Sequence, residues 1–430
     1  MIDPHPPAAS LPPPKPMLSP ASAPGRSVPA KGLASALATT TTIQILSTAT
    51  ALVLTGIAPL VARDFGLAPH WVGYQISVIY ASGMIASAMA GAMIVRFGPV
   101  RIEQLALLCY ALALLLLTTG NAWIAGLASL VIGVGYGVQN PASAQILGKV
   151  TPPARRALIF SIKQAGVPLG GVIASLAYPA LAPVIGWRMA LALTAVPCLA
   201  MIAVLTSHGD GPRGPASRAG GSMVGRLAGS FLYEQRLVWG HASLRVLALL
   251  GMLYSSLQLS LSAFTVSMLV DHGWPLVAAG MVAGVVQACG AVGRISWGLV
   301  GDRIGGFRVL CAIGLIAMAC MVALWRLDAM PAAVQIAVLG LFGFCMSGWN
   351  GVLMAECTRH CQPRDAGRVI GGALVYTFLG VMIGPAVAAL VYEACGDYGT
   401  TFLLMSWVAG LGAVMAGWMA WSDRAAASKT

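Results

Sequence analysis

The 430-residue chain is 58% hydrophobic and only 9% charged, whereas soluble globular proteins carry about 25% charged residues. This composition excludes an ordinary soluble fold and is typical of a protein that lies mostly within a membrane. The formal net charge of +12 is by itself compatible with nucleic-acid binding, so its distribution along the chain decides how it is interpreted.

Twelve stretches of mostly apolar residues each approach the roughly 20 residues that a helix needs to cross a bilayer. Because backbone groups in lipid must be hydrogen-bonded within the segment itself, we predict that all twelve are helices in an all-α membrane protein. They lie near residues 37–60, 72–95, 103–120, 123–147, 158–182, 187–207, 244–270, 275–300, 309–326, 332–357, 369–393 and 400–421.

Polar segments divide these helices into two groups of six. The amino-terminal segment, before the first predicted helix, contains ten prolines, which predicts a disordered tail rather than a cleaved signal peptide. The longest internal polar segment, rich in Gly and Arg, predicts a linker. The predicted divisions are a cytoplasmic tail 1–33, an N-terminal half 34–207, a cytoplasmic linker 208–242 with an amphipathic surface helix Leu227–Trp239, a C-terminal half 243–422, and a cytoplasmic tail 423–430.

Lys and Arg are distributed unevenly between the two sides of the predicted bundle. Twenty lie in segments on the side of the amino terminus, and three, Arg63, Arg188 and Arg326, lie on the opposite side. Cytoplasmic loops of membrane proteins carry this kind of excess. The net charge therefore indicates topology rather than nucleic-acid binding, and it predicts that both termini are cytoplasmic, as in a bacterial inner membrane protein.

One sequence pattern occurs twice, about 207 to 210 residues apart. At an offset of 207, Gly91, Arg96, Gly98 and Arg101 correspond to Gly298, Arg303, Gly305 and Arg308. At an offset of 210, Asn140, Gly170 and Gly186 correspond to Asn350, Gly380 and Gly396. Two similar membrane halves around one central path are a common architecture of secondary transporters, so the repeat predicts transport.

The second copy, Gly298-x-x-x-Asp302-Arg303-x-Gly305-x-x-Arg308, resembles the signature of the major facilitator superfamily between helices 2 and 3 and helices 8 and 9. The resemblance covers about residues 35–422 and implies twelve transmembrane helices in two pseudo-symmetric six-helix halves. It also implies that this loop takes part in gating. Glycines permit its tight turn, and its arginines are expected to bridge the halves in the outward-open state.

Two further features belong to this predicted gate. Glu356 at the end of helix 10, with Arg359 three residues on, resembles the acidic member of the same network, and a solvated helix end is the alternative. The first-half copy has Val95 where the acid belongs, so we expect weaker contacts from Arg96 and Arg101. Ordinary anchoring on the cytoplasmic side is the alternative for all of these arginines.

Two cationic side chains lie inside predicted spans, where an uncompensated charge costs several kcal/mol. Arg294 lies one turn deeper than Gly298 in helix 8. The sequence around it resembles that of the monocarboxylate and oxalate-type carriers of the superfamily, in which an arginine at this place holds the substrate carboxylate. A guanidinium suits this role because its planar fork donates two parallel hydrogen bonds. Lys163, followed by Gln164, lies in helix 5, which packs against helix 8 in this fold.

The resemblance therefore predicts that both cations line one cavity. Each lies only about 7–8 Å inside its helix, so snorkelling of the side chain to the membrane surface is the alternative.

The acidic residues also bear on the cargo. Glu103, Asp271, Asp302, Glu356 and Glu393 are all near the ends of predicted spans, and no acid lies in the middle of one. An exporter of lipophilic cations usually needs a buried carboxylate, so this arrangement favours an anion. It also removes the obvious proton relay, because Gly290 stands where proton-coupled carriers of this kind have an acid.

Neutral polar and aromatic side chains complete the predicted substrate path. Asn and Gln also hold membrane helices together, and aromatic residues there more often pack, so a structural role is the alternative for each. Besides Arg294, Lys163 and Gln164, the predicted binding residues are Gln44, Asn140, Tyr254, Gln258, Asn350, Trp349 and Tyr376.

These observations favour a monomeric secondary active or facilitative carrier that moves a small organic anion by alternating access. The two cations predict that this anion is a carboxylate. A multi-solute or drug exporter of the same superfamily is the alternative, and it predicts transport of uncharged or cationic compounds that does not depend on Arg294. The chain has no His-Glu-x-x-His, Gly-x-Ser-x-Gly or nucleotide-binding Gly-Lys-Ser/Thr motif, and its nine cysteines lack metal-site spacing. We therefore predict no enzymatic activity, cofactor, metal or nucleotide.

Overall fold

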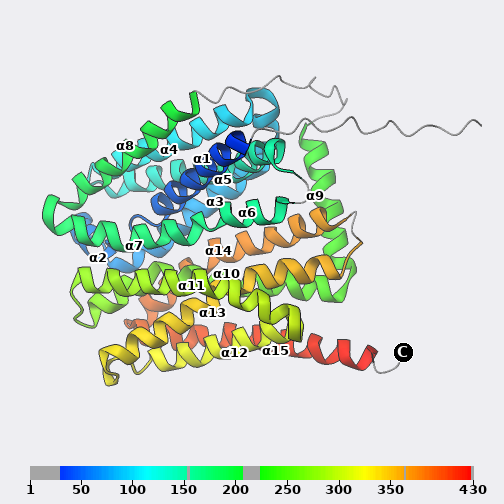
Figure 1. Cartoon of the computed structure of the whole chain (residues 1–430). Coiled ribbons are helices and arrows are strands. Elements are labelled where there is room, and N and C mark those ends of the chain that lie inside the picture. Colours follow the sequence, from blue (N-terminus) through cyan, green and yellow to red (C-terminus); the bar gives the residue numbers. More distant parts are fainter. Residues whose placement is uncertain (1–29, 153–154, 207–222, 363–364, 428–430) are drawn as a thin grey trace, which may run out of the picture.

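The computed structural model describes residues 30–152, 155–206, 223–362 and 365–427, and nearly all of them are helical (Figure 1). The first half contains α1 (Ala30–Ala51), α2 (Ala58–Phe65), the 3₁₀ turn η1 (Pro69–Trp71), α3 (Val72–Phe97), α4 (Pro99–Leu117), α5 (Ala122–Val150), α6 (Arg156–Gln164), α7 (Gly166–Ile185) and α8 (Trp187–Thr206). The second half contains α10 (Ala242–Asp271), α11 (Leu276–Ile304), α12 (Gly306–Leu324), the turn η3 (Leu327–Ala329), α13 (Ala332–Arg359), α14 (Ala366–Cys395) and α15 (Tyr398–Ala427).

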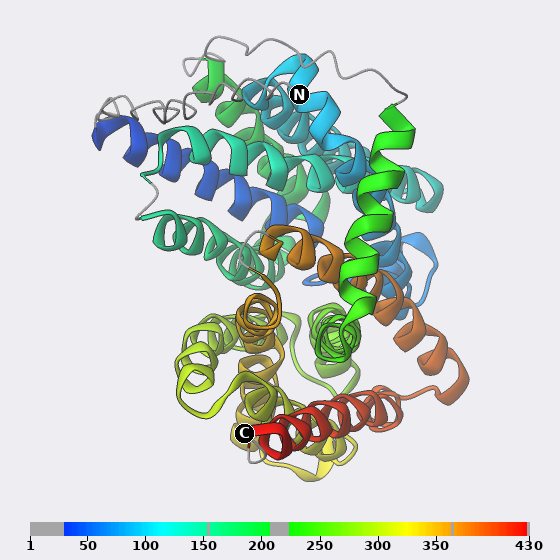
Figure 2. The same ribbon diagram turned by 90° about the vertical axis from the view of Figure 1, so that its right-hand side faces the viewer.

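A further helix, α9 (Met223–Gly240), precedes the second half and contains the segment for which a surface helix is predicted. It packs against α10 and α14. Figure 2 shows α9 running beside α14 across the region where the two halves meet.

Among the described residues, eleven helices are long and apolar enough to cross a membrane. The first predicted span is the exception, because α1 is 22 residues long but too polar, and turns at residues 52–57 separate it from α2. Its side chains Thr40, Gln44 and Ser47 are fully buried. The polar residues that lower the hydropathy of α1 thus face the interior of the bundle, where α1 packs against α5 and α7.

The two halves pack by the same scheme. In the first half α3 packs against α5, α1 against α7, and α4 against α8. In the second half the equivalent helices pair in the same way: α11 with α13, α10 with α14, and α12 with α15. The repeat in the sequence is therefore also a repeat in the structure.

The repeated loop shows why glycine occurs at the same place in both copies. Gly98, between α3 and α4, has φ 90° and ψ 151°, and Gly305, between α11 and α12, has φ 94° and ψ 141°. Residues with a Cβ rarely adopt this region, whereas glycine does so freely. The predicted tight turn is confirmed at both positions.

The two ends of the bundle differ in how the halves meet. We call the end near α9, where α3 ends at Phe97 and α11 at Ile304, the linker end, and the opposite end, with α2, η1 and η3, the far end (Figure 1). The halves contact each other mainly along α7 with α11 and α3 with α14. In both pairs, the closest approaches lie toward the far end.

Two glycines permit these approaches. A Cβ on Gly73 of α3 would lie 2.4 Å from the carbonyl oxygen of Pro385 in α14. A Cβ on Gly280 of α11 would lie 2.5 Å from the carbonyl oxygen of Ser175 in α7. Real Cβ atoms do not come this close to a backbone oxygen, so only glycine lets the halves meet here.

A polar contact joins the halves at the same end. Glu393 of α14 accepts a hydrogen bond from the hydroxyl of Tyr74 at 3.0 Å, and its Oε1 lies 3.1 Å from Nε2 of His70. Toward the linker end of the same helices, a Cβ on Gly91 or Gly298 would meet no atom within 4 Å. The described residues therefore show the far end closed between the halves.

Candidate functional site

Lys163 lies at the end of α6, directly before the break between α6 and α7, and its side chain is held inside the first half. Its ammonium donates a hydrogen bond to Oε1 of Gln44 in α1 at 2.7 Å and another to Oδ1 of Asn140 in α5. Only 3% of Lys163 is exposed. The side chain thus points into the bundle rather than snorkelling, and three of the predicted binding residues lie together.

Arg294 of α11 lies where the second half faces the first. The side chain is half-buried and close enough to Tyr136 of α5 to interact with it electrostatically. Its Nε is buried without a hydrogen-bond partner among the described residues. Buried donors are rarely left unpaired in native proteins, so this guanidinium has donors available for a ligand.

One face of α5 connects the two cations. We call Tyr136, Asn140 and Ser143 the α5 stripe, because residues at i, i+4 and i+7 lie on one side of a helix. From the rise of a helix, Asn140 lies about 6 Å and Ser143 about 10 Å along the axis from Tyr136. Each stripe residue has one charged neighbour: Arg294 lies near Tyr136, Lys163 contacts Asn140, and Glu103 contacts Ser143.

The position of Glu103 corrects an expectation from the sequence. Glu103 does lie near the end of a span, as predicted, but we expected no buried carboxylate, and Glu103 is fully buried between α4 and α5. The hydroxyl of Ser143 donates to Oε1 of Glu103 at 2.5 Å. The first turns of α4 pack against α5, so closeness to a helix end does not expose this side chain. A carboxylate therefore does lie inside the bundle near a predicted cation.

Tyr136, the neighbour of Arg294, belongs to an aromatic pair that was not predicted from the sequence. The rings of Tyr80 in α3 and Tyr136 form an edge-to-face pair with centroids 5.2 Å apart. In the second half, Gln287 of α11 donates to Ser262 at 3.3 Å. Helical periodicity alone gave no signal for these residues, because most aromatic and amide side chains in membrane helices serve in packing.

Three predicted binding residues lie elsewhere. Gln164 is exposed. Consecutive residues of a helix point about 100° apart, so when Lys163 points into the bundle, Gln164 points away from it. The hydroxyl of the buried Tyr254 donates to the carbonyl of Leu310 at 2.8 Å, which joins α10 to α12. Tyr376 donates to Gln235 of α9 at 2.9 Å. These contacts hold helices together and bring none of the three to the cations.

The remaining predicted residues form a separate group in the second half. The indole nitrogen of Trp349 in α13 donates to Oε1 of Gln258 in α10 at 3.1 Å. Trp349 is almost fully buried, and Asn350 beside it is half-buried. Contact of these three residues with a substrate stays a prediction.

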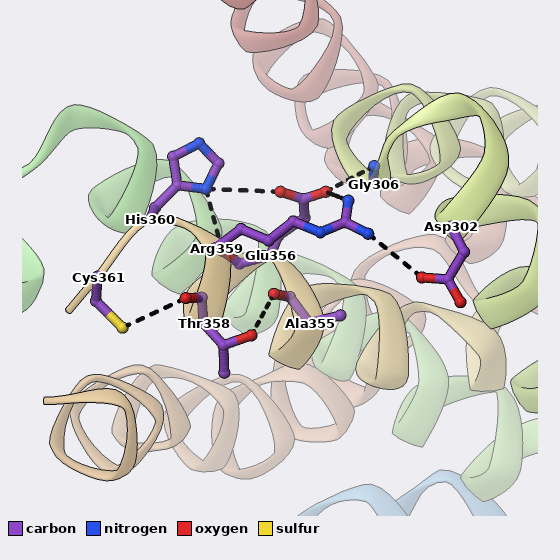
Figure 3. A network of polar contacts seen from close by, with 8 residues as sticks. All are labelled: Asp302, Gly306, Ala355, Glu356, Thr358, Arg359, His360 and Cys361. Carbon is purple, nitrogen blue, oxygen red and sulfur yellow. Dashed lines mark hydrogen bonds and ion pairs between the residues drawn. The ribbon is translucent and has the colours of Figure 1, made fainter. Parts of the chain in front are cut away.

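A polar cluster at the linker end of the second half contains three of the predicted gating residues, Asp302, Glu356 and Arg359 (Figure 3). Glu356 is buried and accepts hydrogen bonds from the backbone N–H of Gly306 at 2.7 Å and from Arg359 at 2.9 Å. Arg359 also contacts Oδ1 of Asp302 at 3.3 Å, and His360 lies 3.5 Å from the second oxygen of Glu356. The cluster therefore joins α11, α12 and α13 within one half.

The arginines of the repeated loop take no part in these bonds. Arg303 and Arg308, which we expected to bridge the halves, are exposed, and the partner of Asp302 is Arg359. In the first half, Arg101 is exposed and Arg96 lies over the ring of Phe97, 5.1 Å from its centroid. A bridge between the halves at the linker end is not expected while the far end is closed, because alternating access opens one end when the other closes.

We expect Glu356→Ala to lower the free energy of unfolding by about 1–3 kcal/mol, because the buried N–H of Gly306 and the guanidinium of Arg359 would both lose their acceptor. Asp302→Ala is the matched control. Its side chain is 72% exposed, and such surface pairs contribute about 0–1 kcal/mol. Thermal unfolding of both variants in detergent would measure the difference, and equal melting temperatures would contradict the structural role of Glu356.

Comparisons with known proteins identify the family of the chain. The sequence profile of the Major Facilitator Superfamily matches residues 40–380. An uncharacterised transporter of this type from Mycobacterium tuberculosis is 26% identical over 56% of the chain, although the match spans only about half, 52%, of that relative. The gallate transporter of Pseudomonas putida is 24% identical over 78% of the chain and 81% of its own length.

Among solved structures, a bacterial homologue of the human lysosomal transporter Spinster, in an inward-facing and unoccupied conformation, has a TM-score of 0.76. The match covers 90% of this chain and 97% of that one at 16% identity. At this identity, the similarity concerns the fold alone.

Proposed function

The chain belongs to the Major Facilitator Superfamily and is a multi-pass membrane transporter rather than an enzyme, and we propose that its cargo is a small organic anion with a carboxylate group. The observation that carries this proposal is the pair of cations beside the α5 stripe. Neither Lys163 nor Arg294 forms an ion pair within hydrogen-bond distance of an acid in the described part of the chain, and Arg294 has an unpartnered buried donor.

Electrostatics favours an anion at this place. An ionised side chain within a membrane span is costly unless a partner compensates its charge. The acceptors bonded to Lys163 are the neutral amide oxygens of Gln44 and Asn140, which solvate the ammonium without neutralising it. A carboxylate between Lys163 and Arg294 would supply negative charge to both, and would match the fork of the guanidinium.

The relative from Pseudomonas putida supports this class of cargo, because gallate is an aromatic carboxylate. The edge-to-face pair of Tyr80 and Tyr136 beside Arg294 is compatible with a planar acid. Aromatic rings pack favourably at such distances in offset or edge-to-face geometry.

We further propose that the chain lies in a bacterial inner membrane with its linker end in the cytoplasm and that it works as a monomer. The distribution of Lys and Arg along the sequence supports this orientation, with twenty in segments assigned to the side of the amino terminus and three in segments assigned to the opposite side. The closed far end then makes this conformation inward-facing. Transport would follow from rocking of the halves about the site, with the contacts of the far end breaking as those of the linker end form.

Counterflow in proteoliposomes tests the proposed cargo. Vesicles loaded with an unlabelled acid are expected to accumulate the same acid in labelled form, for gallate or for another member of a panel of aromatic and aliphatic carboxylates. Pyrogallol, which lacks the carboxylate of gallate, is the matched control and is not expected to exchange. Movement of a lipophilic cation with no exchange of any carboxylate would instead support a multi-solute or drug exporter.

A further inference from the structure

Glu103 is a buried carboxyl group that the proposed site does not use. It comes from α4, is completely buried, and receives one hydrogen bond, from Ser143 to Oε1. Its second oxygen, Oε2, is buried without a hydrogen-bond partner in the part of the chain that the structure describes. Ser143 itself accepts a hydrogen bond from Gln139 at 2.9 Å, so the hydroxyl is oriented toward Glu103.

This environment suits a group that alternates between a charged and a neutral form. Burying a carboxylate that accepts only one hydrogen bond costs much free energy, because its negative charge is poorly solvated. A protonated carboxyl group is neutral, so its burial costs less, and its proton can reside on the oxygen that accepts no hydrogen bond. Two titratable side chains interact with Glu103 electrostatically, Lys163 of α6 and Tyr110 of α4. The hydroxyl of Tyr110 is already hydrogen-bonded to Ser47 at 2.8 Å, which leaves Lys163 as the charge that favours ionised Glu103.

The α5 stripe places the proposed anion near both groups. Asn140 touches Lys163 and Ser143 touches Glu103, and these two stripe residues are only about 4.5 Å apart along the helix axis. When no anion is present, ionised Glu103 can offset part of the charge of Lys163, although the two form no direct ion pair in the described part of the chain. An anion that binds Lys163 adds a second negative charge beside Glu103, and a nearby like charge favours the neutral form of a carboxyl group.

We propose that Glu103 is the proton-binding residue of this transporter, and that it takes up one proton when the anion binds and releases it when the anion leaves. This inference rests on the proposed function, since it takes the cargo to be a carboxylate. One proton then accompanies one negative charge of the cargo, so that a monocarboxylate would cross the membrane without net charge. It also revises the expectation from the sequence that the chain lacks a proton relay.

The location of Glu103 gives the proton a short route. It is the fifth residue of α4, about 6 Å along the helix from Pro99 at the linker end. In the inward-facing conformation this is the end that is not closed between the halves. Proton exchange with the cytoplasm would therefore occur in the same state in which the anion enters or leaves the cytoplasm.

The test uses gallate in proteoliposomes and measures proton-coupled accumulation of the anion separately from its exchange across the membrane. An outside-acid pH gradient is expected to drive accumulation of gallate by the native chain, while counterflow at equal pH proceeds without a gradient. Glu103→Gln keeps the shape of the neutral form but cannot release a proton. We expect it to lose pH-driven accumulation at least tenfold and to keep counterflow. Asp328→Asn, which alters an acid that is 84% exposed at the far end, is the matched control and is expected to behave like the native chain.

Each other outcome has a definite meaning. Full pH-driven accumulation by Glu103→Gln would overturn the proposal, and so would loss of counterflow together with accumulation in a variant of native melting temperature, since Glu103 would then serve binding rather than coupling. Absence of carboxylate exchange by the native chain would contradict the proposed function instead.

An infrared measurement examines Glu103 without transport. In lipid vesicles, titration to acid pH is expected to produce the carbonyl band of a protonated carboxyl group that is missing in Glu103→Gln and present in Asp328→Asn. Addition of gallate at constant pH is expected to increase that band in the native protein. Identical titrations of the native chain and Glu103→Gln would show that Glu103 does not exchange a proton, and would overturn the proposal.

Discussion

Arg294→Ala is expected to abolish carboxylate counterflow. The guanidinium lies between the halves beside Tyr136 and has a buried donor without a partner, so an anion bound there would receive charge-assisted hydrogen bonds in a setting with little water. Truncation of one member of a buried charged pair costs about 2–5 kcal/mol, much of it from the partner that is left unpaired. Affinity should therefore fall at least about 30-fold, since each 1.4 kcal/mol corresponds to a factor of ten.

Two further variants make this result specific. Arg294→Lys keeps the charge but loses the planar fork, so it should retain part of the exchange with weaker binding. Arg326→Ala is the control, because Arg326 is exposed at the far end and lies over the ring of Trp325, 4.5 Å from its centroid. Initial rates over a range of gallate concentrations would distinguish weaker binding from slower turnover. Full exchange by Arg294→Ala would remove Arg294 from the site and favour the exporter.

The sequence predicted that Lys163 lies in the interior of the bundle with other polar residues, but not which side chains it contacts. A cation within an apolar span must be solvated by the protein, and amides on neighbouring helices are the available groups. Gln44 and Asn140 were selected as neutral polar residues along the predicted central path, not as partners of Lys163, and both accept hydrogen bonds from it. Gln164 was selected only because it follows Lys163, and one residue along a helix is enough to turn a side chain to the opposite environment.

Glu103 shows what the sequence could not provide. Its place five residues into α4 was read as a helix end near the membrane surface, but burial depends on which helix packs against that turn. That information belongs to tertiary structure, here to the packing of α4 against α5. One signal was available: the long apolar run of this span begins at Ile102 and is interrupted at once by an acid.

For the repeated loop at Gly98 and Gly305, the backbone could be predicted from the sequence, but the partners of the arginines could not. The repeat and its glycines were correctly predicted from spacing, and both turns have the same backbone conformation. The partners of the arginines could not be predicted in the same way, because they change with conformation in a transporter that opens at alternate ends. In this conformation Asp302 pairs with Arg359 of its own half, and the hydrogen bond from Tyr74 to Glu393, which joins the halves, lies at the far end.

The double variant Gly73→Ala with Gly280→Ala is expected to open the far end. Each added methyl group would lie within 2.5 Å of a backbone oxygen of the other half, so neither clash can be relieved by rotating a side chain. Overpacking of this kind costs about 1–3 kcal/mol per site. The two sites lie on different helix pairs, α3 with α14 and α11 with α7, so their effects should add to roughly 2–6 kcal/mol.

Such an energy would shift the ratio of far-end-closed to far-end-open protein by at least about 30-fold. Hydrogen–deuterium exchange would detect it as faster exchange near residues 68–80 and 380–398 and slower exchange near the linker-end loops at Gly98 and Gly305. Gly126→Ala is the control, because Gly126 of α5 has no atom within 4 Å of an added Cβ. Exchange of the double variant identical to that of Gly126→Ala would mean that the far end does not close through these two glycines. A shift toward the linker-end-closed state would instead show that close backbone contact at Gly73 and Gly280 sets which end of the transporter is open.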